Sequence, residues 1–220
     1  MPPILVPLSY KKLSVDEVAT RARAFYDQMN RRRSVRAFSA EPVPSSVIHD
    51  LVRTASTAPS GAHQQPWTFV AVSAPDVKHE IRVAAEREEE INYSGRMPDE
   101  WVQALEPIGT DATKPFLEQA PWLVVLFRQD YGYDDQGARR HHYYVAESAG
   151  IAAGLFLTAV HYAGLVALTH TPSPMGFLKR ILKRPDNETA SLLIPVGYPA
   201  PDAKIPNLKR KSLDKVLVTI

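Results

Sequence analysis

Pro121-Trp122-Leu123-Val124-Val125-Leu126-Phe127 is an apolar run without a single charged side chain. A strand with one face in water alternates apolar and polar residues, whereas a strand covered on its faces reads as a continuous apolar run. The run is also too short for an average helix and is rich in valine and aromatic residues. We therefore expect a buried strand here, in a sheet that carries helices on its faces.

Outside this run, segments with the apolar pattern of a strand and segments with that of a helix alternate imperfectly along the chain. Further strands are expected at 67–72, 165–169, 192–196 and 216–220. Helices are expected at 14–31, from Pro44 to about 58, 74–93, 143–163 and 177–183. The terminal strand 216–220 follows a polar arm, and a strand in that position often adds to the edge of a neighbouring sheet. The pattern predicts an α+β fold with a mixed β-sheet flanked by helices.

Length and composition indicate one globular domain spanning 1–220, with an N-terminal arm at 1–13 and a C-terminal arm at 199–220. The net charge of +2 gives no strong field for nucleic acid or an anionic membrane. Cysteine is absent, which excludes disulfides, iron–sulfur clusters and cysteine nucleophiles. The apolar start of the chain is short and broken by proline, so we expect neither a secretory signal nor a membrane span, and a cytoplasmic location.

Several common catalytic motifs are missing from the chain. It contains no G-x-G-x-x-G after a strand, no P-loop and no G-x-S-x-G. The seven histidines show no metal-ligand spacing, so no metal site is expected. A dinucleotide-binding Rossmann site, an NTPase and a serine hydrolase are therefore unsupported.

Four other stretches carry polar chemistry, each with an ordinary alternative. Arg32-Arg33-Ser34-Val35-Arg36 offers guanidinium groups for a phosphate, but also reads as a solvated basic helix end. The stretch 59–67, Pro-Ser-Gly-Ala-His-Gln-Gln-Pro-Trp, lets backbone N–H groups approach a planar ligand, or is a plain loop into a strand. Thr169-His170-Thr171-Pro172 places hydroxyls at a strand end, or is a simple exit from a strand into a turn. Lys209-Arg210-Lys211 is the fourth candidate, or is a plain basic tail.

A fifth stretch, Glu88-Glu89-Glu90-Ile91-Asn92-Tyr93, suggests recognition of a free amino acid. On a helix, Glu89 and Tyr93 share one face, and Lys114 lies beyond a proline-broken stretch from which it can approach them. A carboxylate, a phenol and an ammonium that converge can hold a zwitterion. On spacing alone, a solvated charged helix face is the more common explanation.

Together and in this order, these stretches resemble the FMN-dependent nitroreductase superfamily, over about 25–220. Within that superfamily the chain is most similar to the iodotyrosine deiodinases of a soluble, bacterial type. The most specific matches are Glu-Glu-Ile-Asn-Tyr at 89–93, Thr-His-Thr-Pro at 169–172, Pro-Val-Gly-Tyr-Pro at 195–199 and Lys-Arg-Lys at 209–211.

The resemblance implies roles for individual residues. It implies an α+β homodimer with an exchanged C-terminal arm and FMN at the interface. Ala62 would offer its backbone N–H to the substrate phenolate, and Glu89, Tyr93 and Lys114 would bind the amino-acid end. The Thr171 hydroxyl, as the catalytic group, would lie near flavin N5. The implied FMN contacts are Arg32, Arg33, Ser34, Arg36, Ser60, Thr169, His170, Thr171 and Arg210.

The activity that the resemblance implies is reductive dehalogenation of halotyrosines, from 3-iodotyrosine to tyrosine and iodide, with NAD(P)H or another reductant as electron donor. Two alternatives remain open at this point: a general NAD(P)H-dependent nitroreductase or quinone reductase, and a non-catalytic flavin- or halotyrosine-binding protein. The chain departs from the family pattern at His170, where threonine is common, and in a segment after Pro172 that is one residue shorter. Both departures lie beside the expected flavin.

Overall fold

The computed structural model describes residues 3–220, which divide into two compact units, one ending at Arg32 and one spanning Arg33–Ile220. In the first unit, helix α1 (Val15–Asn30) confirms the predicted N-terminal helix. Its start is a capping box, because Ser14 Oγ accepts from the Glu17 backbone N at 3.2 Å and Glu17 Oε2 accepts from the Ser14 N at 3.0 Å. Residues 1–2 of the predicted N-terminal arm lie outside the described residues.

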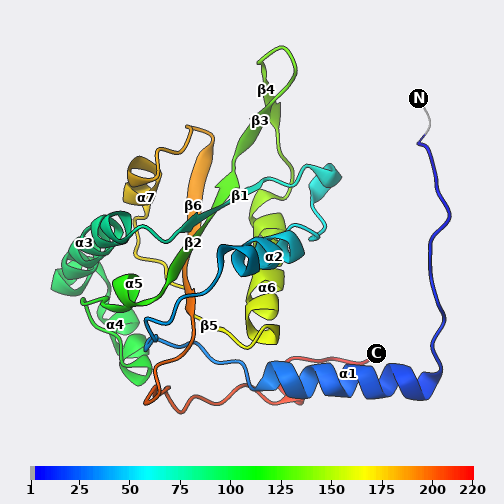
Figure 1. Ribbon diagram of the computed structural model, residues 1–220, viewed down its shortest axis with the longest axis horizontal. Coiled ribbons are helices and arrows are strands. Elements are labelled where there is room, and N and C mark those ends of the chain that lie inside the picture. The colour runs from blue at the N-terminus through cyan, green and yellow to red at the C-terminus, as the bar shows by residue number, and fades with distance from the viewer. Residues whose placement is uncertain (1–2) are drawn as a thin grey trace. The chain divides into compact units, whose positions relative to one another are not determined.

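The second unit is built on one four-stranded sheet (Figure 1). Its strands, in spatial order, are β1 (Trp67–Val72), β2 (Trp122–Gln129), β6 (Glu188–Gly197) and β5 (Val166–Ala167). Neighbouring strands are antiparallel, and a single parallel bridge, between Ser34 and Ala167, makes the sheet mixed. The four internal strands expected from the sequence are confirmed, with β6 longer and β5 shorter than expected.

Strand β2 lies in the middle of the core, as its unbroken apolar run predicts. Leu123, Val125 and Phe127 belong to the hydrophobic cluster on one face of the sheet. Val124 and Leu126 belong to the clusters on the other face. All five side chains have 0% exposure, so burial of apolar surface on both faces, rather than alternation with water, fixes this strand.

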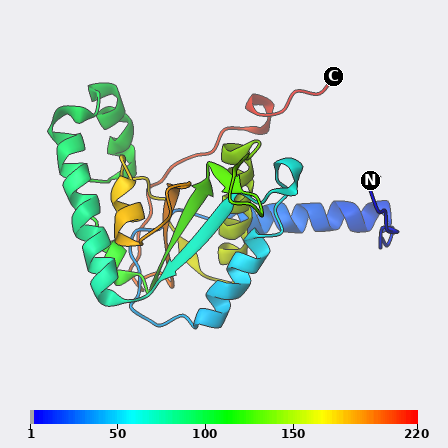
Figure 2. The same cartoon turned by 90° about the horizontal axis from the view of Figure 1, so that it is seen from above.

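Helices cover the two faces of the sheet, giving three layers (Figure 2). One face carries α3 (Pro75–Ile91), α5 (Phe116–Gln119) and α7 (Gly176–Ile181), which contribute residues such as Ile81 and Leu178 to its cluster. The opposite face carries α2 (Ser45–Ala55) and α6 (Val145–Tyr162). Among residues 3–220, α6 alone is long and apolar enough for a membrane span, but Phe156 and Val160 pack it into the core.

Several elements were not anticipated from the sequence. Helix α3 continues into a π-helical turn (Asn92–Arg96), followed by α4 (Asp99–Leu105) and the 3₁₀ turn η3 (Glu106–Ile108). A β-hairpin pairs β3 (Tyr131–Tyr133) with β4 (Arg139–His141). Short 3₁₀ turns also form at Gly61–His63 and Leu213–Lys215.

The predicted strand at 216–220 is wrong for the chain by itself. After the 3₁₀ turn Leu213–Lys215, the residues are irregular and exposed. A strand needs a hydrogen-bonding neighbour, and within the described residues no strand pairs with this segment.

Candidate functional site

The candidate site is a cavity of about 230 Å³ between the end of α3, the segment that follows it, and the segment after β5. Its walls are polar on one side, where side chains from α3 and from Lys114 meet. The other wall comes from Arg36 and from the segment 169–173. We call it the flavin-side segment, after the role that the sequence analysis predicts for it. Seven of the residues predicted from the sequence line this one cavity: Arg36, Glu89, Tyr93, Lys114, Thr169, His170 and Thr171.

Lys114 is the most deeply buried charged residue of the site, with 1% exposure. Its Nζ lies 3.3 Å from Glu89 Oε2 and 3.2 Å from Thr110 Oγ1, and it also donates to the Asp111 carbonyl. A buried ammonium is stable only when it is paired and hydrogen-bonded. Three oxygen partners satisfy that need and fix the position of the charge at the cavity wall.

Glu89 and Tyr93 lie on the same side of the helix end, as their spacing predicts. We call Glu89, Tyr93 and Lys114 the amino-acid clamp, after the role that the sequence analysis predicts for them. Tyr93 Oη donates to the Thr110 carbonyl at 3.1 Å, and the Lys114 ammonium lies 5.9 Å from the centre of its ring. Burial, and next the Glu89 carboxylate, raise the pKa of Tyr93, so its phenol stays a hydrogen-bond donor.

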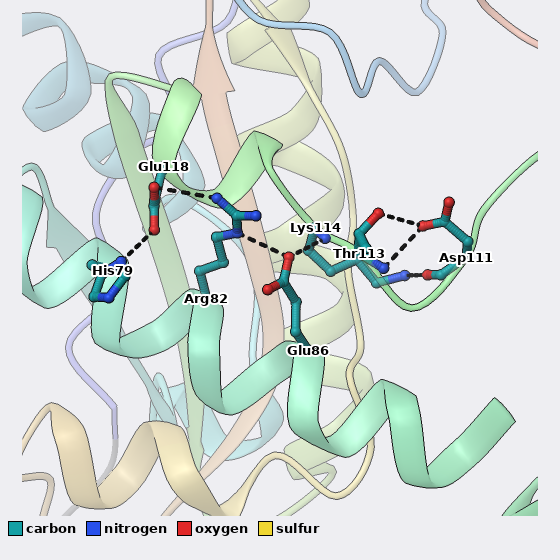
Figure 3. A network of polar contacts seen from close by, with 7 residues as sticks. All are labelled: His79, Arg82, Glu86, Asp111, Thr113, Lys114 and Glu118. Atoms are coloured by element: carbon teal, nitrogen blue, oxygen red, sulfur yellow. Dashed lines mark hydrogen bonds and ion pairs between the residues drawn. The ribbon is translucent and has the colours of Figure 1, made fainter. Parts of the chain in front are cut away.

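A network between α3 and α5 holds the backbone of Lys114 (Figure 3). Glu86 Oε1 accepts from the Lys114 backbone N at 2.5 Å and from Arg82 Nε at 2.8 Å. Arg82 Nη1 reaches Glu118 Oε2 at 3.3 Å, and His79 Nδ1 lies 2.7 Å from Glu118 Oε1. Since α3 also carries Glu89, this network fixes one helix against the other and aligns the two ends of the clamp.

Arg36 supplies positive charge to the opposite wall of the cavity. Its guanidinium is withdrawn from water, and this desolvation lowers the pKa of Arg36. Among residues 3–220, no carboxylate forms an ion pair with it. A guanidinium in this state is suited to a ligand that offers anionic or carbonyl oxygens.

His170 is held neutral beside this wall. Its backbone pairs with Leu193 through N–H···O distances of 2.9 and 3.0 Å, and its ring meets Phe116 edge-on at 5.5 Å. Burial, followed by the charges of Lys114 and Arg36, lowers the pKa of His170 to about 3. Its Nε2 is buried and has no hydrogen-bond partner among the described residues.

Three further residues predicted to contact FMN, Arg33, Ser34 and Arg210, lie outside this cavity. Arg33 Nη2 donates to the Pro206 carbonyl of the C-terminal arm, and Ser34 forms the parallel bridge with Ala167. Arg32 is the last residue of the first unit. Arg210 is exposed on the C-terminal arm. The side chains of Arg33, Ser34 and Arg210 do not line the cavity.

Ser60 and Ala62 also lie away from the cavity, in a loop with unusual backbone geometry. Ala62, His63 and Gln65 have φ values of 49°, 55° and 48°, a conformation that L-residues seldom adopt. The Gln64 side chain fixes this loop, because its Nε2 donates to the His141 carbonyl and its Oε1 accepts from the Tyr143 N, both at 2.9 Å. Strained backbone of this kind is often found at ligand sites.

Tight packing against the neighbouring segment adds to this constraint. The Gly61 N donates to Ser148 Oγ at 3.3 Å, and a Cβ at Gly61 would lie 2.5 Å from the Tyr143 carbonyl oxygen. Glycine is therefore required here by the close approach of the Tyr143 backbone.

The sequence did not single out the apolar part of the cavity. Met97, Trp101, Leu105 and Ile108 line it from the segment that follows the π-helical turn. Trp101 and Leu105 are four residues apart in α4 and so share one face. That spacing, soon after Glu89 and Tyr93 in the chain, is the signal that would have found them. Together they form a wall suited to an aromatic ring.

Comparison with known proteins agrees with this geometry. The model of the nitroreductase family matches residues 29–198. The chain is 53% identical to iodotyrosine deiodinase of Haliscomenobacter hydrossis, covering 98% of this chain and 97% of that protein. It is 47% identical to iodotyrosine deiodinase 1 of Homo sapiens, covering 98% of this chain and 75% of that protein.

Solved structures give the same relationship. Iodotyrosine deiodinase bound to FMN and 3-iodo-L-tyrosine has a TM-score of 0.74 at 28% identity, covering 86% of this chain and 96% of that one. A BluB-like flavoprotein from Clostridium difficile has a TM-score of 0.66 at 18% identity, covering 88% of this chain and 97% of that one, and shares the fold.

Proposed function

Since the chain belongs to the nitroreductase family, and within it to the iodotyrosine deiodinases, we propose that it is an FMN-dependent oxidoreductase that dehalogenates halotyrosines, with 3-iodotyrosine giving tyrosine and iodide. The observation that carries this proposal is the buried Lys114–Glu89 pair beside Tyr93, on the wall of the cavity that Arg36 and Thr171 also line. A general nitroreductase has no need of a buried zwitterion site next to its flavin.

The residues of the cavity fit FMN. Arg36 is a desolvated guanidinium with no carboxylate partner in the described chain, and the Thr169 and Thr171 hydroxyls lie on the same wall. Such donors match the carbonyl and nitrogen atoms at the edge of an isoalloxazine ring. We assign the ring edge to these three residues, with the Thr171 hydroxyl donating near N5. The remaining FMN contacts of this proposal are Arg32, Arg33, Ser34, Ser60, His170 and Arg210.

The amino-acid clamp binds and orients the substrate. In this proposal the Glu89 carboxylate accepts from the substrate ammonium. Lys114 exchanges its bond to Thr110 Oγ1, and Tyr93 its bond to the Thr110 carbonyl, for bonds in which both donate to the substrate carboxylate. The aromatic ring then packs against Met97, Trp101 and their neighbours, which exclude water from the reacting carbon.

Bound reduced FMN supplies two electrons, so that the carbon–iodine bond breaks, a carbon–hydrogen bond forms with one added proton, and iodide leaves. The Ala62 backbone N–H donates to the phenolate oxygen in our assignment and stabilises its negative charge. The strained, side-chain-fixed loop around Ala62 supports this role, because a preorganised N–H loses nothing on binding.

We also infer that the enzyme works as a homodimer with an exchanged C-terminal arm. Within one chain, the loop of Ser60 and Ala62 does not line the cavity of the amino-acid clamp. A second copy would bring that loop to the site, and would give the exposed apolar residues Leu213, Val216 and Leu217 of the arm a surface to cover. Sedimentation equilibrium tests this part of the proposal, with a single species of twice the chain mass as the expected result.

Iodide release tests the activity. The purified holoenzyme, reduced with dithionite or with NADPH, is mixed with 3-iodotyrosine, and iodide and tyrosine are measured with nitrobenzene and a quinone as comparison substrates. We expect equal amounts of iodide and tyrosine. Reduction of the nitroarene and the quinone without any iodide from iodotyrosine would instead identify a general nitroreductase.

A further inference from the structure

Asn92 lies in the π-helical turn between Glu89 and Tyr93, but its side chain points to a different part of the site. It is buried, with 7% exposure, and its Nδ2 donates to the Ser173 carbonyl at 2.9 Å. Ser173 is two residues after Thr171 and ends the flavin-side segment. One side chain therefore joins the helix end that carries the clamp to the segment that carries the proposed flavin hydroxyls.

A second donor from the same turn reaches the same carbonyl. Arg96 Nη1 lies 3.5 Å from the Ser173 oxygen and 2.7 Å from Glu88 Oε2. The Ser173 carbonyl is thus the point where the π-helical turn holds the flavin-side segment. Both Asn92 and Ser173 also line the cavity itself.

Termination of helix α3 does not need the Asn92 side chain. The backbone N–H of Asn92 bonds to the carbonyls of Glu88 and Glu89, and its own carbonyl accepts from the Met97 N at 3.0 Å. Its amide is therefore free for a contact between segments that lie 81 positions apart in the chain. If the Ser173 carbonyl moved away, the buried Asn92 amide would lose its acceptor at a cost in free energy. The π-helical turn and the flavin-side segment therefore move together.

We propose that Asn92 is a positioning residue that couples halotyrosine binding at the amino-acid clamp to retention of FMN by the flavin-side segment. This inference rests on the proposed function, because it needs both ligands in one cavity. Substrate that orders Glu89 and Tyr93 also orders the start of the π-helical turn, where Asn92 lies, and through Asn92 it fixes residues 171–173. By linkage, the ligand at one end then strengthens binding at the other.

The test measures FMN dissociation from the oxidised holoenzyme after dilution, by recovery of free-flavin fluorescence, with and without saturating 3-iodotyrosine. Without reductant the ligand is not consumed. The quantity compared is the ratio of the two rates, because a general loss of stability changes both rates together. For the unmodified enzyme we expect iodotyrosine to slow dissociation at least about fivefold. For Asn92→Ala we expect a ratio below about two.

Asn187 offers a matched control. It is also buried, with 8% exposure, and its Nδ2 donates to the Tyr131 carbonyl at 2.7 Å, but it contacts the hairpin rather than the cavity. Asn187→Ala should lower stability and leave the ratio as in the unmodified enzyme. If Asn92→Ala fails to hold FMN, Arg96→Gln decides the question, since Arg96 is 40% exposed and its replacement does not empty the core.

The outcomes separate cleanly. A smaller ratio for Asn92→Ala or Arg96→Gln, with Asn187→Ala unchanged, supports the inference. An unchanged ratio in the Asn92 and Arg96 variants overturns it and leaves direct contact between the ligands as the cause of any slowing. No slowing in the unmodified enzyme also overturns it, and iodide release by that enzyme then shows that the proposed function stands without it.

Discussion

Lys114 Nζ lies 3.3 Å from Glu89 Oε2, so the two charged ends of the amino-acid clamp face each other across the cavity wall. A zwitterion that binds beside this pair meets an ammonium and a carboxylate that are already desolvated and fixed. Its own carboxylate and ammonium then continue an alternating row of charges. The pair therefore explains both why these residues tolerate burial and why a free amino acid is the matching ligand.

Removing one charge of this pair should abolish recognition of the amino-acid end. Lys114→Met leaves Glu89 without its buried partner, and truncation of one side of such a pair costs about 2–5 kcal/mol, or about 30-fold or more in affinity. Titration of flavin fluorescence with 3-iodotyrosine measures the loss. Retention of FMN should be unchanged.

The ion pair of half-buried Arg184 and buried Glu188 serves as the control for this experiment. Arg184 Nε lies 2.7 Å from Glu188 Oε2, and neither residue lines the cavity. Glu188→Gln should lower stability but bind 3-iodotyrosine as the unmodified protein does. Equal affinity in the Lys114→Met variant would contradict the assignment of the clamp.

The network between α3 and α5 should influence substrate affinity through Lys114. Glu86→Ala removes the acceptor of the Lys114 backbone N–H, which is 2.5 Å away, and leaves that donor unsatisfied at a cost of about 1–3 kcal/mol. We expect 3-iodotyrosine affinity to fall by about tenfold, while Glu86→Gln, which keeps the acceptor, loses less.

Glu90→Ala is the comparison for this prediction, because Glu90 is an exposed carboxylate on the same helix. Its affinity for 3-iodotyrosine should not change. Binding is measured by the same fluorescence titration, and an equal loss in the Glu86 and Glu90 variants would assign the effect to charge rather than to the position of Lys114.

His170 should make the fold sensitive to acid. Burial lowers the pKa of His170 from 6.5 to about 3, so the folded state binds no proton where the unfolded state does. Stability is therefore complete above pH 6.5 and declines as the pH falls from 6.5 toward 3, by up to about 1.4 kcal/mol per pH unit. His170→Gln removes this contribution.

Urea unfolding at several pH values between 8 and 5 measures the effect. The free energy of unfolding of His170→Gln should fall less steeply with acid than that of the unmodified protein. Replacement of the exposed His49 by glutamine should leave the original dependence. Identical slopes in the two variants would show that His170 gains a proton in the folded state as easily as in the unfolded chain.

Gln64 should control the preference for ionised halophenols. Gln64→Leu removes both hydrogen bonds that hold the strained loop around Ala62, so we expect a looser loop and about tenfold weaker binding of 3-iodotyrosine. The affinity of the unmodified protein should rise with pH through the phenol pKa of the ligand, and the variant should lose part of this dependence. Gln136→Leu, on the exposed hairpin loop, is the control.

Much of the fold follows from local patterns that are clear in the sequence. The unbroken run from Trp122 to Phe127 is buried on both faces, and the Ser14–Glu17 pair starts a helix as its spacing predicts. These features depend on side chains that satisfy one another locally or on a burial pattern that only one element fits. The sequence also predicted that Glu89 and Tyr93 lie together, because their spacing places both on one face of a helix.

Other features depend on contacts that no local pattern reveals. The π-helical turn Asn92–Arg96 is held by the Ser173 carbonyl, far away in the sequence, and the conformation of Ala62 is held by Gln64 on the backbone of 141–143. The segment 216–220 has the composition of a strand, but it lacks a neighbour within the described chain. Long-range partners decided these three cases, and propensity did not.

The most direct test of the central claim is a titration of the oxidised, FMN-loaded protein with 3-iodotyrosine, beside 2-iodophenol, which lacks the amino-acid end. The account predicts strong quenching of flavin fluorescence by iodotyrosine alone, because Glu89, Tyr93 and Lys114 bind the zwitterion, followed by iodide release when dithionite is added. Equal quenching by both compounds, or none by either, would contradict it and reduce the clamp to a charged helix end.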